Sequence, residues 1–146
     1  MRFRLLVTTT IMVTLLLSGC SGELKFGPGM QDFDRELPND FRLFKASAHE
    51  MMIVPKEGTF EENNTIPSKV IKLGWNKNYI IAVQHPLKEN PEKNNGVEIP
   101  DKKVENYWII KPSKEIVGPL SKKEFTRYKD KFELGDLELK KISEYD

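Results

Sequence analysis

Two apolar runs rich in β-branched and aromatic residues stand on either side of a short polar segment in the middle of the chain. KVIKLGW precedes Asn76-Lys77-Asn78, and YIIAVQHP follows it. Such residues favour a pleated, half-buried strand, and asparagine tolerates the left-handed backbone that tight turns need. The pattern therefore predicts a β-hairpin that turns at residues 76–78, which commits this part of the chain to an antiparallel sheet.

Other short apolar runs repeat this strand signal. They are FRLFKASA (41–48), HEMMIVP (49–55) and NYWIIKPSKEIVGPL (106–120), the last of which predicts a second hairpin with strands near 107–111 and 115–119. Polar segments at 56–67 and 88–105 separate these runs and are interpreted as loops, with a turn at Asn95-Gly96. A short closing strand is predicted at 137–142.

The periodicity changes at Ser121. Ser121 and Glu124 have the spacing of a capping box, and Phe125, Tyr128 and Phe132 then recur on one face of a helix. The glycine at position 135 is expected to end this helix. The predicted fold class is therefore α+β: mainly an antiparallel sheet of hairpins, or an open barrel, with one C-terminal helix packed on it.

The first 20 residues have the pattern of an exported lipoprotein. MRFR precedes an uncharged run, residues 5–17, that is shorter than the roughly 20 apolar residues a membrane-spanning helix needs. The run ends at Leu17-Ser18-Gly19-Cys20, which has the form of a bacterial lipobox. We expect Cys20 to receive a diacylglyceryl group and residues 1–19 to be removed as a signal peptide. The alternative is an ordinary buried cysteine.

Cys20 is the one cysteine of the chain, so a lipidated Cys20 leaves no thiol for a disulfide. The expected location is the extracytoplasmic face of the cell membrane, with the lipid anchor as the membrane contact. Removal of residues 1–19 changes the formal net charge from +1 to −1, because the segment holds two arginines and no acidic residue. This balance predicts no nucleic-acid partner.

Residues 20–38 are interpreted as a flexible tether, because three glycines and two prolines lie in this segment and no periodicity is sustained. Asp32, Asp34 and Glu36 alternate like the carboxylates of a calcium loop, but Leu37 stands where such a loop needs glycine. A solvated linker is therefore favoured. Residues 39–146 are predicted to form a single small α+β domain.

Three stretches carry a resemblance to a known group of proteins. They are LPNDFRLFKASAHEMMI, GWNKNYIIAVQHP and YWIIKPSKEIVGPLSKKEF, which follow the lipobox. Together they resemble a family of small lipoproteins of unknown function from Bacillus-like Gram-positive bacteria. The similarity covers about residues 37–134 and is most specific at 74–82 and 107–120. It implies the domain boundaries and the location, and it implies no catalytic residue.

No motif in the sequence indicates a known catalytic site. A nucleophile elbow, an H-E-x-x-H pair and a phosphate-binding glycine loop are all missing from the sequence. His49 and His85 are the only histidines, and each lies at the edge of a predicted strand, where histidine commonly bonds a turn. We therefore predict a non-enzymatic binding module that needs no metal and no cofactor. A hydrolase that uses His49 or His85, with Glu50 as a helper, is the alternative.

Trp75, Tyr79 and His85 form the candidate binding surface. Exposed aromatic rings stack on sugars, so the expected partner is a cell-wall glycan or another envelope protein. The alternative is that the aromatic residues stabilise the sheet as cross-strand pairs. Core packing is the favoured interpretation for Trp108 and, in part, for Trp75.

Overall fold

The computed structural model describes residues 33–47, 49–93 and 96–145. Cys20, the lipobox residues Leu17, Ser18 and Gly19, and the predicted signal peptide lie outside these residues. The described residues form one compact unit. Among the described residues, no helix is long and apolar enough to cross a membrane.

The first sheet is antiparallel and has the strand order β1-β2-β3. Its strands are β1 (Phe33–Leu37), β2 (Phe41–Lys45) and β3 (Met51–Pro55). A tight turn joins β1 to β2, in which Asn39 and Asp40 both have a φ of 60° and the Phe41 N–H donates to the Pro38 carbonyl over 3.3 Å. Left-handed backbone at both central positions is typical of the type I′ hairpin turn.

β1 corrects the predicted extent of the tether. Residues 33–37 pair with β2 along their whole length, up to Leu37 opposite Phe41. Leu37 is buried, and the Asp34 carboxylate forms a 2.6 Å ion pair with the Arg42 guanidinium on β2. The last part of the predicted tether is therefore a strand, because one edge of its backbone pairs with β2 and Leu37, its one large aliphatic side chain, is buried.

The second sheet has five strands in the order β10-β4-β5-β8-β9. They are β4 (Val70–Trp75), β5 (Ile80–Gln84), β8 (Asn106–Ile110), β9 (Ile116–Leu120) and β10 (Lys140–Lys141). The predicted hairpin at residues 76–78 joins β4 to β5. Asn76 Oδ1 accepts hydrogen bonds from the backbone N–H groups of Asn78 and Tyr79, at 2.9 and 2.8 Å. The second predicted hairpin is β8–β9.

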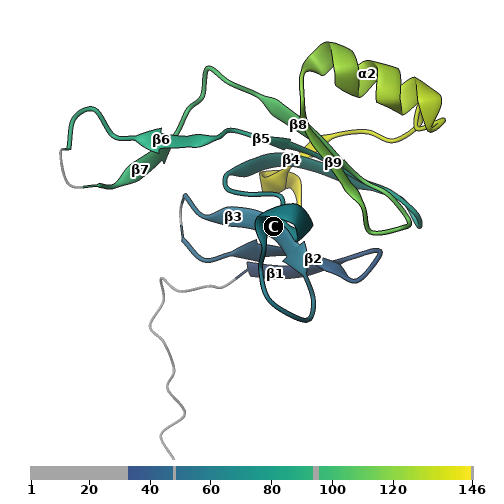
Figure 1. Ribbon diagram of the computed structural model, residues 1–146, viewed down its shortest axis with the longest axis horizontal. Helices are drawn as coiled ribbons and strands as arrows, with labels where there is room; N and C mark the ends of the chain where they lie inside the picture. The colour runs from purple at the N-terminus through teal and green to yellow at the C-terminus, as the bar shows by residue number, and fades with distance from the viewer. Residues whose placement is uncertain (1–32, 48, 94–95, 146) are drawn as a thin grey trace, which may run out of the picture. The chain divides into compact units, whose positions relative to one another are not determined.

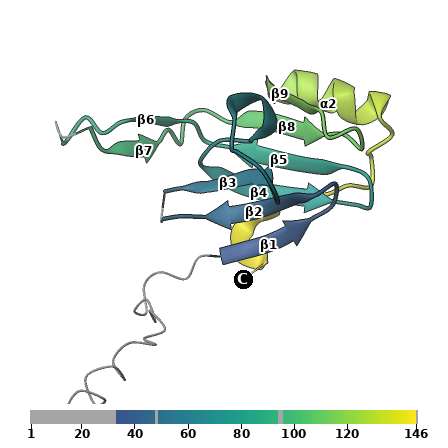
Figure 2. The same cartoon turned by 60° about the horizontal axis from the view of Figure 1, so that its bottom comes forward.

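Two hydrophobic cores lie on opposite faces of the five-stranded sheet. Along β5, Ile80 and Ala82 pack in the core shared with the first sheet, whereas Ile81 and Val83 pack in the core under the helix. This alternation follows from the two-residue period of a strand. Figure 2 shows the first sheet and the helix α2 (Lys122–Lys131) on the two sides of the five-stranded sheet. The fold class is α+β, with separate antiparallel sheets rather than a closed barrel.

The helix begins at its predicted cap and ends earlier than predicted. The Glu124 N–H donates to Ser121 Oγ, and the Ser121 N–H donates to the Glu124 carboxylate, which is the reciprocal capping box. Phe125 is buried under the helix. Helical structure stops at Lys131, and Glu133 adopts the left-handed conformation with a φ of 55°. Glu133 therefore supplies the chain reversal that the sequence assigned to the glycine at position 135.

The polar segment 88–105 is more ordered than predicted. β6 (Leu87–Glu89) and β7 (Glu98–Pro100) form a separate two-stranded antiparallel sheet in it, and Figure 1 shows this hairpin extending from the ends of β5 and β8. The other predicted loop, 56–67, holds the 3-10 helix η1 (Glu62–Asn64). The predicted closing strand is reduced to β10, which η2 (Ile142–Glu144) follows directly.

Candidate functional site: a lysine-lined cavity

A cavity of about 370 Å³ lies where β3, β4 and the β10–η2 segment meet the base of the β6–β7 hairpin. Small-molecule sites in proteins have volumes of roughly 300–1,000 Å³, so this cavity is large enough to hold a ligand. We call it the lysine cavity. Its apolar wall consists of Met51, Val70, Ile71, Pro100 and Ile142.

The apolar wall is the edge of the core between the two sheets. Met51 begins β3, Val70 begins β4 and Ile142 begins η2, and all three belong to the core shared by the sheets. Their relative exposures are 8%, 1% and 7%. Because buried side chains on both sheets hold this wall, its shape is set by the packing of the fold rather than by a loop.

Basic residues make up most of the polar residues in the lining. They are Lys69, Lys72, Lys102, Lys141 and the imidazole of His85, and none of the lining residues in the described ranges is acidic. Lysine is a compact, strongly hydrated cation that binds phosphate and carboxylate groups. A cavity with this lining favours an anionic ligand.

Strand register places two pairs of these residues side by side. Lys72 on β4 is directly opposite Lys141 on β10. Lys69 and His85 exchange both of their backbone hydrogen bonds, each at 2.9 Å. Directly opposed residues of an antiparallel pair have Cβ atoms about 4.5–5.5 Å apart on the same face, and like charges there are destabilising. The register therefore places the side chains of Lys72 and Lys141 on the same face of the sheet.

Glu105 offsets part of this positive charge. Its Oε1 lies 3.6 Å from Lys72 Nζ, and its Oε2 accepts a 2.7 Å hydrogen bond from the Tyr107 hydroxyl. The Tyr107 hydrogen bond, with Lys72 in support, lowers the pKa of Glu105. Burial, and then the bond to Glu105, raise the pKa of Tyr107 to about 12. Glu105 stands beside the cavity without lining it, so the lining itself remains basic.

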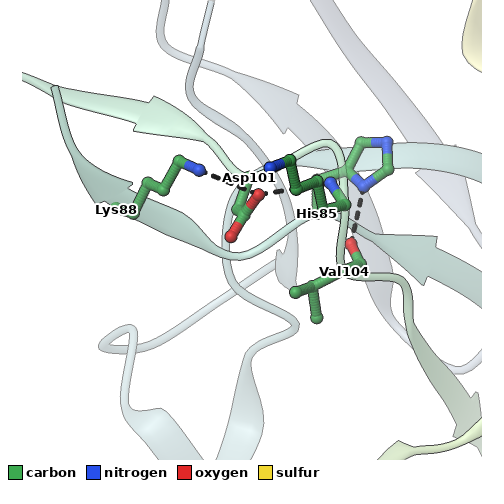
Figure 3. Close-up of polar contacts among 5 residues, drawn as sticks. His85, Lys88, Asp101 and Val104 are labelled. Carbon is green, nitrogen blue, oxygen red and sulfur yellow. Dashed lines mark hydrogen bonds and ion pairs between the residues drawn. The ribbon is translucent and has the colours of Figure 1, made fainter. Parts of the chain in front are cut away.

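The His85 ring is held in one orientation. Its Nδ1 lies 2.7 Å from the Val104 carbonyl oxygen (Figure 3). Because a carbonyl oxygen only accepts, Nδ1 carries a proton and donates it, which leaves Nε2 as the acceptor of the neutral ring. Figure 3 shows the second ring nitrogen on the side away from Val104. The bond therefore fixes both the ring and its tautomer.

Asp101 anchors the base of the β6–β7 hairpin next to the cavity. Its Oδ1 accepts from Lys88 Nζ at 3.0 Å (Figure 3) and from the Lys103 N–H at 3.2 Å. The Asp101 N–H donates to the Pro86 carbonyl over 2.7 Å. The Lys88 hydrogen bond, followed by the Lys103 backbone bond, lowers the pKa of Asp101. The turn that presents Lys102 to the cavity is thus fixed on both sides.

A second cavity, of about 450 Å³, is less suited to a charged ligand. Its lining includes both Asp40 and Lys114, which form a 2.7 Å ion pair with each other. The Lys114 hydrogen bond is the largest cause that lowers the pKa of Asp40. Asn39, also in the lining, donates to the backbone carbonyls of Asn78 and Lys111. These polar groups already bind one another.

The structure separates the three residues of the predicted binding surface. Trp75 packs with the inter-sheet core, its ring 4.9 Å from that of Tyr145, whereas Tyr79 packs under the helix, its ring 5.9 Å from that of Phe132. His85 follows the other end of β5. Trp75, Tyr79 and His85 therefore do not share one face, because Trp75 and Tyr79 fall on opposite faces of the sheet. Of the three, only His85 lines the lysine cavity.

Trp108 is buried at 8% exposure in the inter-sheet core, and Trp75 is partly buried against the same core. Tyr107 is buried at 7% in the core under the helix. The interpretation of Trp108, and partly of Trp75, as core residues is confirmed.

The two histidines lie in different settings. His49 is exposed in the connection between β2 and β3, where its N–H donates to Ser47 Oγ over 3.3 Å. It is not among the residues that line the lysine cavity with His85. Among the described residues, no group of three or more His, Cys, Asp or Glu side chains is placed to hold a metal ion.

Sequence reasoning missed the four lysines of the cavity. Lys69 and Lys72 lie at the start of β4, Lys102 lies in the turn after β7, and Lys141 lies on β10. In its own segment, each resembles an ordinary exposed lysine. No local signal marks them, because the pairing of Lys72 with Lys141 appears only once the strand register is known.

A family model described as a protein of unknown function (DUF3997) matches residues 38–143. The match covers well over half of the chain, so the chain belongs to this family. No curated protein and no solved structure matches the chain.

Proposed function

We propose that this member of the DUF3997 family is a lipid-anchored, non-enzymatic binding module on the extracytoplasmic face of the cell membrane, with the lysine cavity as its ligand site. The cavity supports this role most directly, because it combines an apolar wall fixed by the core with a basic lining. The similarity in sequence to lipoproteins of Bacillus-like bacteria favours a Gram-positive envelope.

Cys20 supplies the anchor in this proposal. Two acyl chains hold a protein stably at a bilayer, whereas one chain is marginal. Residues 21–32 separate Cys20 from β1. A chain of that length spans at most about 45 Å when fully extended. The domain would therefore stay near the membrane surface, where the effective concentration of envelope molecules is high and modest affinity is sufficient.

The basic residues that line the cavity favour an anionic partner over an uncharged glycan. An envelope component with an anionic group would complement the basic residues that line the cavity. Trp75 and Tyr79 lie on opposite faces of the sheet, which weakens the case for a sugar-stacking platform. An anionic envelope molecule is therefore the favoured partner.

Fractionation of cells and mass spectrometry test the anchor. In a Gram-positive host, the full-length protein is expected in the membrane fraction, with a mass of residues 20–146 plus a diacylglyceryl group on Cys20. Cys20→Ser is the matched control and should leave the membrane fraction. An unmodified Cys20 within an intact N-terminus would contradict the proposal.

Two substitutions separate a binding module from the alternative hydrolase. His49→Ala removes one imidazole, and His85→Asn keeps an amide donor where Nδ1 bonds the Val104 carbonyl while it removes the acceptor Nε2. In a deletion strain, a binding module with both substitutions should restore most of the lost phenotype. If the doubly substituted protein folds and reaches the membrane but restores nothing, the histidines carry chemistry and the hydrolase is the better assignment.

A further inference from the structure

We infer that a second cavity, at the end of the five-stranded sheet opposite the lysine cavity, binds an uncharged sugar. It is the cavity of about 450 Å³ whose lining includes Asp40 and Lys114, and we call it the turn cavity. This site goes beyond the proposed function, because it is separate from the lysine cavity and takes a different class of ligand. Three features support it: the segments that form its walls, the backbone of its residues and the hydrogen-bonding groups that they leave unused.

The walls of the turn cavity come from segments that are distant in the chain. The lining residues belong to the β1–β2 turn, the end of β3, η1 and the β8–β9 turn: Asn39, Asp40, Phe41, Pro55, Lys56, Glu57, Asn64 and Lys114. Asn39 links three turns, because its Nδ2 donates to the Asn78 carbonyl of the β4–β5 turn over 2.8 Å and to the Lys111 carbonyl after β8 over 3.3 Å. Figure 2 shows the three turns at the same end of the two sheets. Contacts between hairpins therefore hold the walls.

Left-handed backbone at residues other than glycine is concentrated in this lining. Among the described residues, four non-glycine residues have a positive φ, and three of them line the turn cavity: Asn39 and Asp40 at 60°, and Lys114 at 66°. Asparagine and aspartate tolerate this conformation, whereas lysine is disfavoured there and glycine would adopt it freely. Residues in disfavoured backbone regions cluster at functional sites. Lys114 therefore indicates that its side chain has a role at the cavity.

The charges of the lining are balanced. It holds two acidic residues, Asp40 and Glu57, and two lysines, Lys56 and Lys114. Asp40 and Lys114 form a 2.7 Å ion pair, and Lys56 Nζ lies 3.1 Å from the Glu36 carboxylate outside the lining. A ligand with a net charge would meet a like charge in this cavity. The balance favours an uncharged ligand, in contrast to the lysine cavity.

Donors and acceptors remain after these internal contacts. Asp40 uses Oδ2 in its ion pair, and its Oδ1 accepts no hydrogen bond from the described residues. Lys114 uses one of the three ammonium donors within the described part of the chain, and Asn39 Oδ1 has no donor there. A hydroxyl both donates and accepts, so neighbouring hydroxyls of a sugar ring can bond Asp40 and Lys114 without separating them. An uncharged ligand with several hydroxyls complements these groups.

The binding test uses residues 20–146 with Cys20→Ser, the expected mature chain without its lipid, which contains every described residue. The probes are two uncharged sugars, maltotriose and tri-N-acetylglucosamine, and alanine as a small zwitterion. At least one sugar should shift the NMR amide signals of Asp40 and Lys114 saturably and leave that of Lys102 in the lysine cavity unchanged. Alanine should shift none of them.

The response to the three probes decides the ligand class. No shift with either sugar would overturn the inference, and an equal response to alanine would overturn the choice of a sugar over a zwitterion. Tighter binding of tri-N-acetylglucosamine would support a cell-wall polymer as the source of the sugar, whereas tighter binding of maltotriose would support a glucan. Either preference agrees with an uncharged sugar as the ligand.

Lys114→Gly is the decisive variant, and Glu133→Gly is its matched control. Both positions have left-handed backbone, which glycine adopts without strain, and only Lys114 lines the turn cavity. The ion pair lost with Lys114 is exposed and contributes little to stability. Both variants should therefore remain folded in urea titrations. We expect Lys114→Gly to weaken sugar binding at least fivefold and Glu133→Gly to change it less than twofold. Equal effects of the two variants would overturn the inference.

Salt and one variant of the lysine cavity keep the two sites apart. An uncharged sugar should bind equally well at low and high salt, because screening weakens only the attraction between charges. Lys141→Glu should change sugar binding less than twofold, because Lys141 lines the lysine cavity and not the turn cavity. A steep loss of binding with salt or with Lys141→Glu would overturn the assignment of the sugar to the turn cavity. Failure of the proposed membrane anchor is seen separately, in the mass of Cys20.

Discussion

Lys72 and Lys141 oppose each other directly across β4 and β10, at the edge of the five-stranded sheet. A fold selected for stability alone would place a carboxylate at one of these positions, because opposite charges in a cross-strand pair attract. The Glu105 carboxylate is 3.6 Å from Lys72 Nζ and approaches from the segment before β8. The register therefore sets two like charges opposite each other at the rim of the basic cavity, an arrangement that is destabilising in a cross-strand pair.

Lys141→Glu should make the unliganded protein more stable. The substitution turns a repulsive pair into an attractive one, and cross-strand pairs contribute about 0.2–1 kcal/mol, so an increase of that size in the free energy of unfolding is expected. Urea denaturation of the Cys20→Ser chain at low salt measures it. Lys140→Glu is the control, and a larger gain there would show that the opposed lysines are not strained.

Ser121→Ala should destabilise the protein by about 1 kcal/mol, because it removes the acceptor for the Glu124 N–H at the start of α2. Ser113→Ala is the matched control, since Ser113 is exposed in the turn between β8 and β9. Denaturant melts of both variants measure the difference. Equal losses would mean that the capping box contributes nothing beyond an ordinary surface serine.

Phe125→Ala should cost about 3–5 kcal/mol, because Phe125 is 4% exposed and its ring lies 4.9 Å from that of Tyr107. Phe60→Ala serves as the comparison, since Phe60 is 49% exposed and should cost far less. Thermal and urea unfolding of the two variants test the packing of α2 on the sheet. A loss for Phe125→Ala no larger than that for Phe60→Ala would contradict this packing.

Tyr107 should make stability fall at alkaline pH. Its pKa is raised from 10.0 to about 12 in the folded protein, so the unfolded chain releases this proton first as the pH rises. The stability associated with Tyr107 is therefore complete below pH 10 and is lost between about pH 10 and 12. Tyr107→Phe should flatten this part of the curve, as measured by urea unfolding at a series of pH values. An unchanged slope would mean that Tyr107 titrates normally in the folded protein.

Local sequence determined the hairpins and the start of the helix. The turn at residues 76–78 forms because Asn76 Oδ1 bonds two backbone N–H groups within three residues, and the helix begins where Ser121 and Glu124 cap each other. In both cases the hydrogen bonds join residues two or three positions apart, so the sequence alone predicts them. Burial of Trp108 was expected because aromatic cross-strand pairs stabilise a small sheet, and Trp108 is buried in the structure.

Contacts within the folded protein decided the extent of β1, the end of the helix and the positions of Trp75 and Tyr79. β1 has a weak strand pattern of its own, and it becomes a strand because β2 pairs with one edge of its backbone. Glu133 ended the helix instead of the expected glycine, because the left-handed turn fell two residues earlier. Trp75 and Tyr79 were separated by the faces of the sheet, which the hairpin register assigns.

The lysine cavity shows the same division most clearly. Each of its lysines is an unremarkable polar residue in the sequence, and the lipobox at Cys20 is readable without any structure. Lys72 and Lys141 became neighbours only when β10 paired with β4, and the apolar wall formed only when the first sheet packed on the second. The sequence by itself determined local turns, caps and strand faces, because those depend on residues a few positions apart. The tertiary structure decided the site, because it depends on register between segments that are distant in the chain.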